Sequence, residues 1–294
     1  HQQWLIDHIE ANPDFVAPDN RRNEVLGFLK NEKLEDLCIS RPKERLEWGI
    51  PLPFNPDYVT YVWFDALVNY VSIPRCRGEE ASLWPADIHV IGKDILKFHA
   101  VYWPIMLKAA GLELPKQVLV HGWWQKNNEK MSKSTGNVVD PVEMIEEWDL
   151  DAFRYYVVRE LAIGPDGNWT DEGFTTRYNA ELANSLGNLI NRSLSMLNRY
   201  RDGILSAPHD DLGAEAIAAR DKLVEQLQAN ELQAGLMTIW SFVARMNQYV
   251  DETAPFKLAK DPDQADRLGE VLYNLTEGCR LLAIWLQPYL PTTS

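Results

Sequence analysis

The second half of the chain places apolar residues three and four positions apart, which is the pattern of amphipathic helices. Between residues 174 and 201 this stripe runs through Tyr178, Leu182, Leu186, Leu189, Ile190, Leu194 and Leu197. Similar stripes cover residues 232–250 and 268–286. We therefore predict an antiparallel helix bundle over residues 164–294, with no strand after about residue 162. The turn Gly164-Pro165-Asp166-Gly167 is the expected hinge before the bundle.

The middle of the chain, residues 58–163, alternates short β-rich runs with helical ones. Strands are predicted at residues 58–64, 87–91 and 117–121, with a helix over residues 95–110. Such alternation is typical of βαβ units and a parallel sheet. Three strands are too few for a closed doubly wound domain, so we expect the others upstream of His1. The fold class predicted is thus α/β plus all-α: the second half of a Rossmann-like parallel nucleotide-binding fold, then the bundle.

Residues 1–57 are predicted to form no independent core. They hold one short helix, over residues 21–30, among proline-rich connections.

Composition narrows the class of protein further. The chain has 294 residues, 46% of them hydrophobic and 24% charged, which indicates a folded protein of about two domains. Its net charge of −14 argues against sequence-independent binding of polyanions, so a nucleic-acid partner would need a local site. No apolar run reaches the roughly 20 residues of a membrane span, and we expect no membrane partner.

Three cysteines, Cys38, Cys76 and Cys279, lie far apart without a CxxC pair. This spacing predicts neither a disulfide framework nor a thiolate zinc site, and we expect no metal site in this chain. A cytoplasmic location is expected, with an organellar matrix as the alternative.

The clearest candidate for chemistry is the run Lys130-Met131-Ser132-Lys133-Ser134, which follows a predicted strand and a polar, flexible connection over residues 125–129. Two ammonium groups and two hydroxyls on one loop can surround a polyphosphate and stabilise a departing pyrophosphate. We predict that Lys130 and Lys133 are catalytic. A solvated basic loop is the alternative for any two-lysine loop, but a specified pentapeptide in this context argues against it.

Together with four other blocks, this run closely resembles the methionyl-tRNA synthetase family of class I aminoacyl-tRNA synthetases. The blocks are Cys38-Ile39-Ser40-Arg41-Pro42, Trp48-Gly49-Ile50-Pro51, Tyr61-Val62-Trp63-Phe64-Asp65-Ala66-Leu67 and Gly92-Lys93-Asp94-Ile95 through Phe98-His99. The resemblance extends from near His1 to about Leu290. It implies a ligase that uses ATP with Mg²⁺, methionine and tRNA(Met). The family's His-x-Gly-His-type turn is missing here, so the resemblance also implies a partner: the N-terminal half of the catalytic domain.

The resemblance assigns ATP contacts to two strand ends as well as to the lysine loop. Gly92 and Asp94 look like ribose contacts, and His121 with Gly122 lines the adenine in the family. Ligands of α/β sheets bind at the carboxyl ends of strands, which is where these residues lie. From the residues alone, Asp94 could equally be a helix N-cap and His121 a structural histidine. Met131, Ser132, Lys133 and Ser134 complete the expected ATP set.

Methionine has an unbranched, polarizable thioether, which calls for an aromatic-walled apolar slot with one or two weak donors near sulfur. The resemblance assigns this slot to Trp63, Ala66, Tyr70, Ile95, Phe98 and His99. Trp63 and Phe98 can supply walls, and the Tyr70 hydroxyl and His99 can supply donors. Aromatic residues at such spacings are otherwise ordinary core.

The resemblance assigns anticodon binding to Asn188, Arg192 and Phe256. Asn188 and Arg192 are four apart on one helix face, and an amide with a guanidinium can recognise base edges in a single-stranded loop. Residues 175–201 hold four arginines and one glutamate, a local charge of +3. A solvated helix face is the alternative. Phe256 stands where the family commonly has Trp, so it offers a smaller stacking platform.

We therefore expect a fragment of a methionine:tRNA ligase that is inactive as this chain alone. Two alternatives stay open. The first is a non-catalytic tRNA-binding or interaction module, because half of the active site is missing. The second is another class I synthetase, for leucine, isoleucine, valine or cysteine, against which the set of Trp63, Tyr70 and His99 argues.

Overall fold

The computed structural model describes residues 1–132 and 136–294, without the side chains of residues 80 and 81. The chain divides into two compact units, residues 1–123 and residues 124–294, and each is described by itself. The domain limits predicted at residues 57 and 163 do not coincide with this division. We keep them as proposed boundaries between functional regions. No helix of the described residues is both long enough and apolar enough to cross a bilayer.

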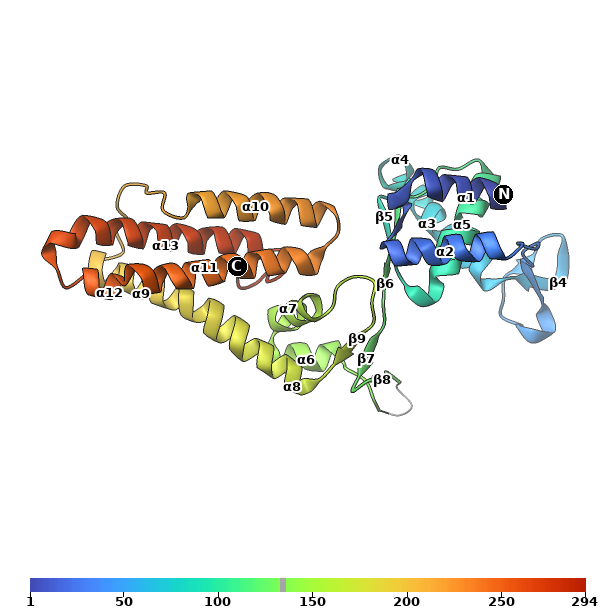
Figure 1. Ribbon diagram of the computed structural model, residues 1–294. Helices are drawn as coiled ribbons and strands as arrows, with labels where there is room; N and C mark the ends of the chain where they lie inside the picture. The colour runs from blue at the N-terminus through green and yellow to red at the C-terminus, as the bar shows by residue number, and fades with distance from the viewer. Residues whose placement is uncertain (133–135) are drawn as a thin grey trace. The chain divides into compact units, whose positions relative to one another are not determined.

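The first unit is built on a three-stranded parallel sheet in the order β1-β6-β5. The predicted strands at 87–91 and 117–121 are confirmed as β5 (Ile88–Gly92) and β6 (Gln117–His121). The third strand, β1 (Val16–Ala17), was not expected, and it brings part of residues 1–57 into the same sheet. Helices α1 (Gln2–Ala11) and α2 (Asp19–Asn31) pack with β1, β5 and β6 in one core (Figure 1). The helix predicted at 21–30 is thereby confirmed, and a 3₁₀ turn (Pro13–Phe15) follows α1.

A second core in this unit lies between α3 (Val62–Cys76) and the helical stretch after β5. That stretch is a 3₁₀ turn (Lys93–Ile95), a π-helical segment (Phe98–Tyr102) and α5 (Trp103–Ala110), so the helix predicted at 95–110 is confirmed with a change of winding. The short helix α4 (Glu80–Leu83) follows α3.

The strand predicted at residues 58–64 is wrong in its second half. Strand β4 (Asn55–Thr60) ends before it, and Val62 already begins α3. Trp63, Leu67 and Val71 pack into one core at a spacing of four, a helical period that overrides the β-favouring residues at 61–64. Strand β4 pairs instead with β2 (Ser40–Pro42) and β3 (Pro51–Leu52) in a small antiparallel sheet, with a 3₁₀ turn (Lys43–Arg45) beside it.

The second unit opens with another small sheet, in the order β8-β7-β9. The connection expected to be flexible at residues 125–129 is instead a hairpin of β7 (Trp124–Lys126) and β8 (Glu129–Lys130). Its turn residues Asn127 and Asn128 have φ of 55° and 62°, which Asn tolerates and two-residue hairpins require. Strand β9 (Gly167–Trp169) pairs with β7, so strands do not stop at residue 162. The expected hinge at 164–167 therefore lies inside this unit.

The rest of the second unit is helical, as predicted (Figure 1). Helices α6 (Pro141–Trp148) and α7 (Leu150–Glu160) lead to α8 (Asp171–Arg177), a π-helical segment (Tyr178–Gly187) and α9 (Asn188–Arg201). The bundle continues with α10 (Gly213–Gln228), α11 (Leu232–Thr253), α12 (Pro255–Leu258), a 3₁₀ turn (Pro262–Gln264) and α13 (Ala265–Leu286). Side chains of α9, α10, α11 and α13 share one core, in which Leu236, Ile239, Met246 and Leu275 are fully buried.

Candidate functional site

The aromatic residues assigned to the methionine slot lie together in the first unit. Trp63, in the first turn of α3, stacks on Phe98 with ring centroids 4.0 Å apart and an interplanar angle of 12°. The Trp63 ring also meets His99 edge-on at 6.1 Å. The spacing of Trp63, Ala66 and Tyr70 puts all three on one side of α3. The structure thus gathers Trp63, Tyr70, Phe98 and His99 from two helices into one group.

Hydrogen bonds within this group determine the protonation of His99. Its Nδ1 lies 3.1 Å from the Ile95 carbonyl oxygen, which can only accept, so Nδ1 carries the proton. Nε2 therefore accepts from the Tyr70 hydroxyl at 2.9 Å. Burial lowers the pKa of His99, although the hydrogen bond to Ile95 acts in the opposite direction, and burial raises the pKa of Tyr70. Both side chains are accordingly neutral.

This arrangement changes the expected roles of the two donors. The Tyr70 proton and the His99 Nδ1 proton are each used within the protein, so neither is directed at a ligand. Tyr70 is 38% exposed, so part of the residue remains accessible while its hydroxyl proton is held by His99. Ile95 contributes a structural carbonyl in addition to its half-buried side chain.

The residues assigned to ribose and adenine lie at the carboxyl ends of two neighbouring strands. Gly92 ends β5 and pairs in register with His121, which ends β6. A β-carbon at Gly92 would lie 2.6 Å from an Asp94 carboxylate oxygen and 3.6 Å from His121 Cε1, so a larger residue there would displace the Asp94 carboxylate. His121 Nδ1 donates to the Gly122 carbonyl at 2.8 Å. The structure therefore brings Gly92, Asp94, His121 and Gly122 to one edge of the sheet.

The reading of Asp94 as a helix N-cap is wrong, because Gly92 holds the cap position and no side chain caps that turn. Asp94 Oδ1 instead accepts from Trp123 Nε1 at 3.3 Å. The Lys93 ammonium lies 4.2 Å from the centroid of the same indole. Trp123 was missed in the sequence, and its position directly after His121-Gly122 was the available signal.

In the second unit the lysine loop, residues 130–134, begins at the last residue of the β7–β8 hairpin. Lys130 ends β8 opposite Gln125, and Ser132 N donates to the Asn137 carbonyl at 3.0 Å. Met131 is partly buried and packs its side chain against the buried cluster of Ala152, Tyr156, Trp169 and Phe174. Lys133 and Ser134, both assigned to ATP, lie outside the described residues. The ends of the loop are thus anchored by one apolar side chain and one backbone bridge.

Asn188 and Arg192 lie on the exposed face of α9, whereas Leu189, Ser193 and Leu197 form its buried face. Arg192 Nη2 donates to Asn247 Oδ1 at 3.1 Å, and Asn247 Nδ2 donates to the Ser185 and Val243 carbonyls. Asn247 thus orients the Arg192 guanidinium, a role that nothing in the sequence pattern indicated. Phe256, on α12 just after the left-handed residue Ala254, is 47% exposed.

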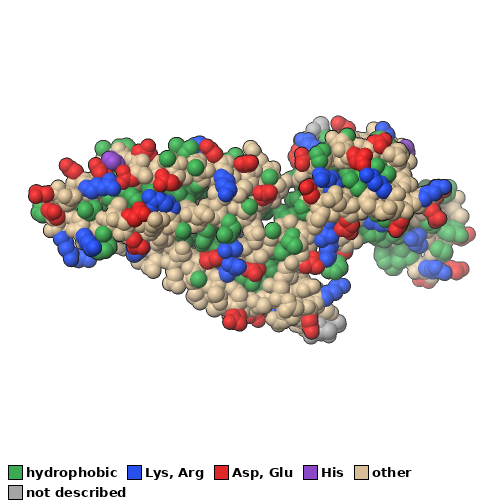
Figure 2. All heavy atoms as spheres, in the orientation of Figure 1, with side chains coloured by type: hydrophobic (Ala, Val, Ile, Leu, Met, Phe, Trp, Pro, Cys, Tyr) green, Lys and Arg blue, Asp and Glu red, His purple; other side chains and the backbone are tan. Residues whose placement is uncertain are grey.

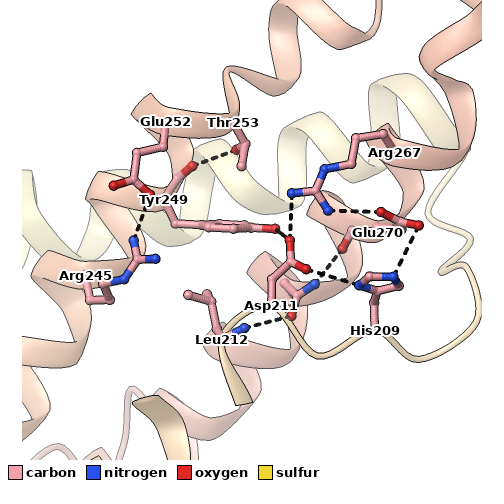
Figure 3. Close-up of polar contacts among 10 residues, drawn as sticks. His209, Asp211, Leu212, Arg245, Tyr249, Glu252, Thr253, Arg267 and Glu270 are labelled. Atoms are coloured by element: carbon pink, nitrogen blue, oxygen red, sulfur yellow. Dashed lines mark hydrogen bonds and ion pairs between the residues drawn. The ribbon is translucent and has the colours of Figure 1, made fainter. Parts of the chain in front are cut away.

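A polar network fastens the loop before α10 to the end of α11 and the start of α13 (Figure 3). Asp211 Oδ2 accepts from the Tyr249 hydroxyl at 2.5 Å and from Arg267 Nη2 at 2.7 Å. The hydrogen bonds from Arg267 and Tyr249 hold the pKa of Asp211 below its usual value. His209 lies between Asp211 and Glu270, 3.2 Å from each. The network therefore ties down the last turns of α11, the helix that carries Asn247 and leads to Phe256.

Ion pairs reduce the number of cations that residues 175–201, with their local charge of +3, can offer to an anion. Arg177 is paired with Glu160 at 2.6 Å and with Glu181 at 3.0 Å, so it is not available to an anion. The exposed arginines of α9 that remain are Arg192 and Arg199. On the face shown in Figure 2, basic and acidic side chains are interspersed over the surface. A polyanion would meet a few cations along α9 rather than a broad basic patch.

Comparison with known proteins gives consistent matches over the whole chain. Residues 1–194 match the family model described as tRNA synthetases class I (M). Methionine–tRNA ligases of Clostridium tetani and Bacillus subtilis are each 45% identical, over 99% and 98% of this chain. The chain spans about half the length of these curated relatives, 46% and 45% respectively.

Solved structures of methionyl-tRNA synthetases also superpose on nearly the whole chain. Mycobacterium tuberculosis methionyl-tRNA synthetase in complex with methionyl-adenylate superposes with a TM-score of 0.90, at 42% identity over 99% of this chain and 59% of that one. The apo form of the same enzyme gives a TM-score of 0.88 at 38% identity.

Proposed function

The chain belongs to the methionyl-tRNA synthetase family of class I tRNA synthetases, and we propose that it forms part of a methionine:tRNA ligase. The complete enzyme would join methionine to ATP as methionyl-adenylate and then transfer the methionyl group to tRNA(Met). The observation that carries this proposal is the slot of Trp63, Phe98, Tyr70 and His99, in which aromatic walls surround two neutral, hydrogen-bonded side chains.

The slot suits a thioether for chemical reasons. Stacked Trp63 and Phe98 offer polarizable surface, which sulfur contacts favourably. The neutral Tyr70–His99 pair offers no charge to a side chain that carries none. An unbranched chain can lie along an aromatic surface more easily than the β-branched side chains of valine or isoleucine, which need width close to Cα.

In the first chemical step, the methionine carboxylate oxygen attacks the α-phosphorus of ATP. A P–O bond to methionine forms, the bond to the β-phosphate bridging oxygen breaks, and pyrophosphate leaves with the electron pair. ATP enters as its magnesium complex, as substrate. Lys130 and Lys133 stabilise the departing negative charge, and Gly92, Asp94, His121 and Gly122 hold the nucleoside. Catalysis of this kind depends on positioning and electrostatics and requires no covalent nucleophile.

In the second step, a hydroxyl of the terminal tRNA adenosine attacks the methionyl carbonyl carbon and AMP leaves. We assign recognition of the tRNA to the helix bundle of the second unit, through residues of α9 and α12. Arg192, oriented by Asn247, and Asn188 can donate to base edges, and the half-exposed Phe256 ring can stack on an anticodon base.

The parallel sheet supports the proposal that an N-terminal half completes the catalytic domain. β5 is an edge strand among the described strands, and its side chains Ile88 and Val90 are 38% and 66% exposed. Parallel sheets are normally covered on both faces, so apolar residues here call for a further layer of polypeptide. We propose that the complete enzyme acts in the cytoplasm or an organellar matrix, which cell fractionation would test.

The direct test is methionine-dependent exchange of pyrophosphate into ATP. It should be strong in the complete enzyme, in which the chain is joined to its N-terminal half, and nearly absent in the 294-residue chain. Lys133→Ala should lower exchange about 100-fold, the loss typical of one transition-state donor. Lys116→Ala is the matched control, because Lys116 pairs with Asp87 on the surface. Strong exchange by the Lys133→Ala enzyme would contradict the assigned role.

The two alternatives give different outcomes. A non-catalytic tRNA-binding module would shift tRNA(Met) in a gel in an anticodon-dependent way, yet the complete enzyme would show no exchange. Another class I specificity would show exchange that depends on leucine, isoleucine, valine or cysteine rather than on methionine.

A further inference from the structure

A second buried histidine lies directly behind the methionine slot. His89, on β5, is 5% exposed, whereas its strand neighbours Ile88 and Val90 point outward. Its ring centroid is 4.2 Å from that of Tyr70, and Trp84 and His99 lie at 6.1 and 6.2 Å. An aliphatic residue is the usual occupant of such an inward position in a parallel strand, so a histidine needs a reason.

Hydrogen bonding supplies that reason. Trp103 is 2% exposed, and its Nε1 donates to His89 Nε2 at 3.3 Å. Since Nε2 accepts, a neutral His89 carries its proton on Nδ1. Burial, with a smaller effect from His99, lowers the pKa of His89 to about 4, so the ring is neutral at physiological pH. An aliphatic side chain would leave the buried Trp103 N–H without an acceptor.

We propose that His89 is a positioning residue of the methionine slot: anchored by Trp103, its ring supports the ring of Tyr70 and so directs the Tyr70 hydroxyl onto His99. This inference rests on the proposed function. His89 itself touches no substrate, and its effect passes through Tyr70.

Two features of Tyr70 make this support necessary. Tyr70 is 38% exposed, so among the described residues no side chains pack against its solvent side to hold it in one rotamer. Its hydroxyl nevertheless has to meet a fixed acceptor, because His99 is 2% exposed and held at its other nitrogen by Ile95. The His89 ring, whose centroid lies 4.2 Å from that of Tyr70 at an interplanar angle of 41°, is the contact that restricts the Tyr70 ring from the side of the strand. Misplacing Tyr70 changes the depth of the slot and hence the affinity for methionine.

The test uses steady-state pyrophosphate exchange by the complete enzyme. His89→Phe keeps a ring but loses the acceptor, and His89→Gln keeps an acceptor but loses the ring. Each should raise the KM for methionine about tenfold, with the KM for ATP unchanged and kcat within about twofold of the parent. In a Tyr70→Phe background, which lacks the hydroxyl, the same His89 changes should have little further effect, because the two residues act as one unit.

Folding is separated from positioning by Trp103→Phe. This change removes the donor that His89→Phe leaves unpaired, so the double variant should regain thermal stability while its KM for methionine stays raised. The inference is overturned by an unchanged KM for methionine, by an equal rise in the KM for ATP, or by full additivity with Tyr70→Phe. If the parent shows normal methionine-dependent exchange, these outcomes overturn the inference alone. A parent without such exchange overturns both the inference and the proposed function.

Discussion

Replacing Glu181 by glutamine is expected to destabilise the second unit by about 3 kcal/mol. The carboxylate comes from the π-helical segment before α9, and its side chain is 18% exposed. It accepts from Arg159 Nε and Nη2 at 3.1 and 3.0 Å, from Arg177 Nη1 at 3.0 Å and from the Tyr155 hydroxyl. One largely buried carboxylate thus joins α7, α8 and the segment that leads into α9.

The magnitude depends on which cation is left without a partner. Arg177 retains Glu160 at 2.6 Å, but Arg159 loses the one carboxylate that the described residues place beside it, and its side chain is 16% exposed. Removing one partner of a buried ion pair costs about 3–5 kcal/mol, and the lower end applies because glutamine still accepts a hydrogen bond. Glu160→Gln is the matched control. Glu160 is 30% exposed and Arg177 retains Glu181, so about 1 kcal/mol is expected.

Urea unfolding followed by far-ultraviolet circular dichroism measures both variants, and hydrogen exchange of residues 150–160 and 178–187 locates the loss. Glu181→Gln should lower the midpoint clearly more than Glu160→Gln, with an unchanged slope against urea. Equal losses in the two variants would refute the reasoning, because they would show that a stranded Arg159 carries no special penalty.

Three further predictions follow from the structure. His89 has a pKa of about 4 when folded and about 6.5 when unfolded, so stability should fall by about 2 kcal/mol, after allowance for solvent screening, as the pH drops from 6.5 to 4. The urea midpoint of His89→Phe should lack that part of the pH dependence. A midpoint that varies with pH in the variant as it does in the parent would contradict this prediction. Phe256→Ala should weaken tRNA binding about 5- to 10-fold in a filter assay without changing exchange, and Phe256→Trp should strengthen it; a uniform loss for all anticodons would argue against stacking. Asp211→Asn should lower the thermal midpoint by about 2–4 °C, since Arg267 keeps Glu270 while the Tyr249 hydroxyl loses a charged acceptor, and an unchanged midpoint would show that the network is not stabilising.

The helix bundle was predictable because its signal is local. Each buried stripe on α9, α11 and α13 repeats at three and four residues, and each helix is long enough for the repeat to stand out. Strand β1 was not predictable, since two residues, Val16 and Ala17, carry no period and their pairing is with β6, about a hundred residues away. The β7–β8 hairpin was predictable only in part. Asn127-Asn128 is a turn signal, but the flanking strands are too short to show an alternation of apolar and polar residues.

The candidate site divides in the same way. Resemblance to a family named Trp63, Tyr70, Phe98 and His99, and the structure brings them together. The direction of their hydrogen bonds was not accessible from the sequence, because it depends on the Ile95 carbonyl, a backbone group that any residue would supply. Trp123 and Asn247 were missed for a different reason: each acts through the side chain of a residue distant in the sequence.

The proposed tRNA binding has to be reconciled with the acidity of the chain. A net charge of −14 repels RNA at long range, and Arg177, Arg245 and Arg267 are each held by carboxylates. The cations left on the exposed face of α9 are too few for a large gain from counterion release. In the proposed function, affinity for tRNA must then come chiefly from contacts to bases, which are the contacts that carry sequence information. The acidity that argues against a general polyanion binder would therefore favour selection of one anticodon over others in the proposed function, because sequence-independent attraction would contribute little to the binding of any tRNA.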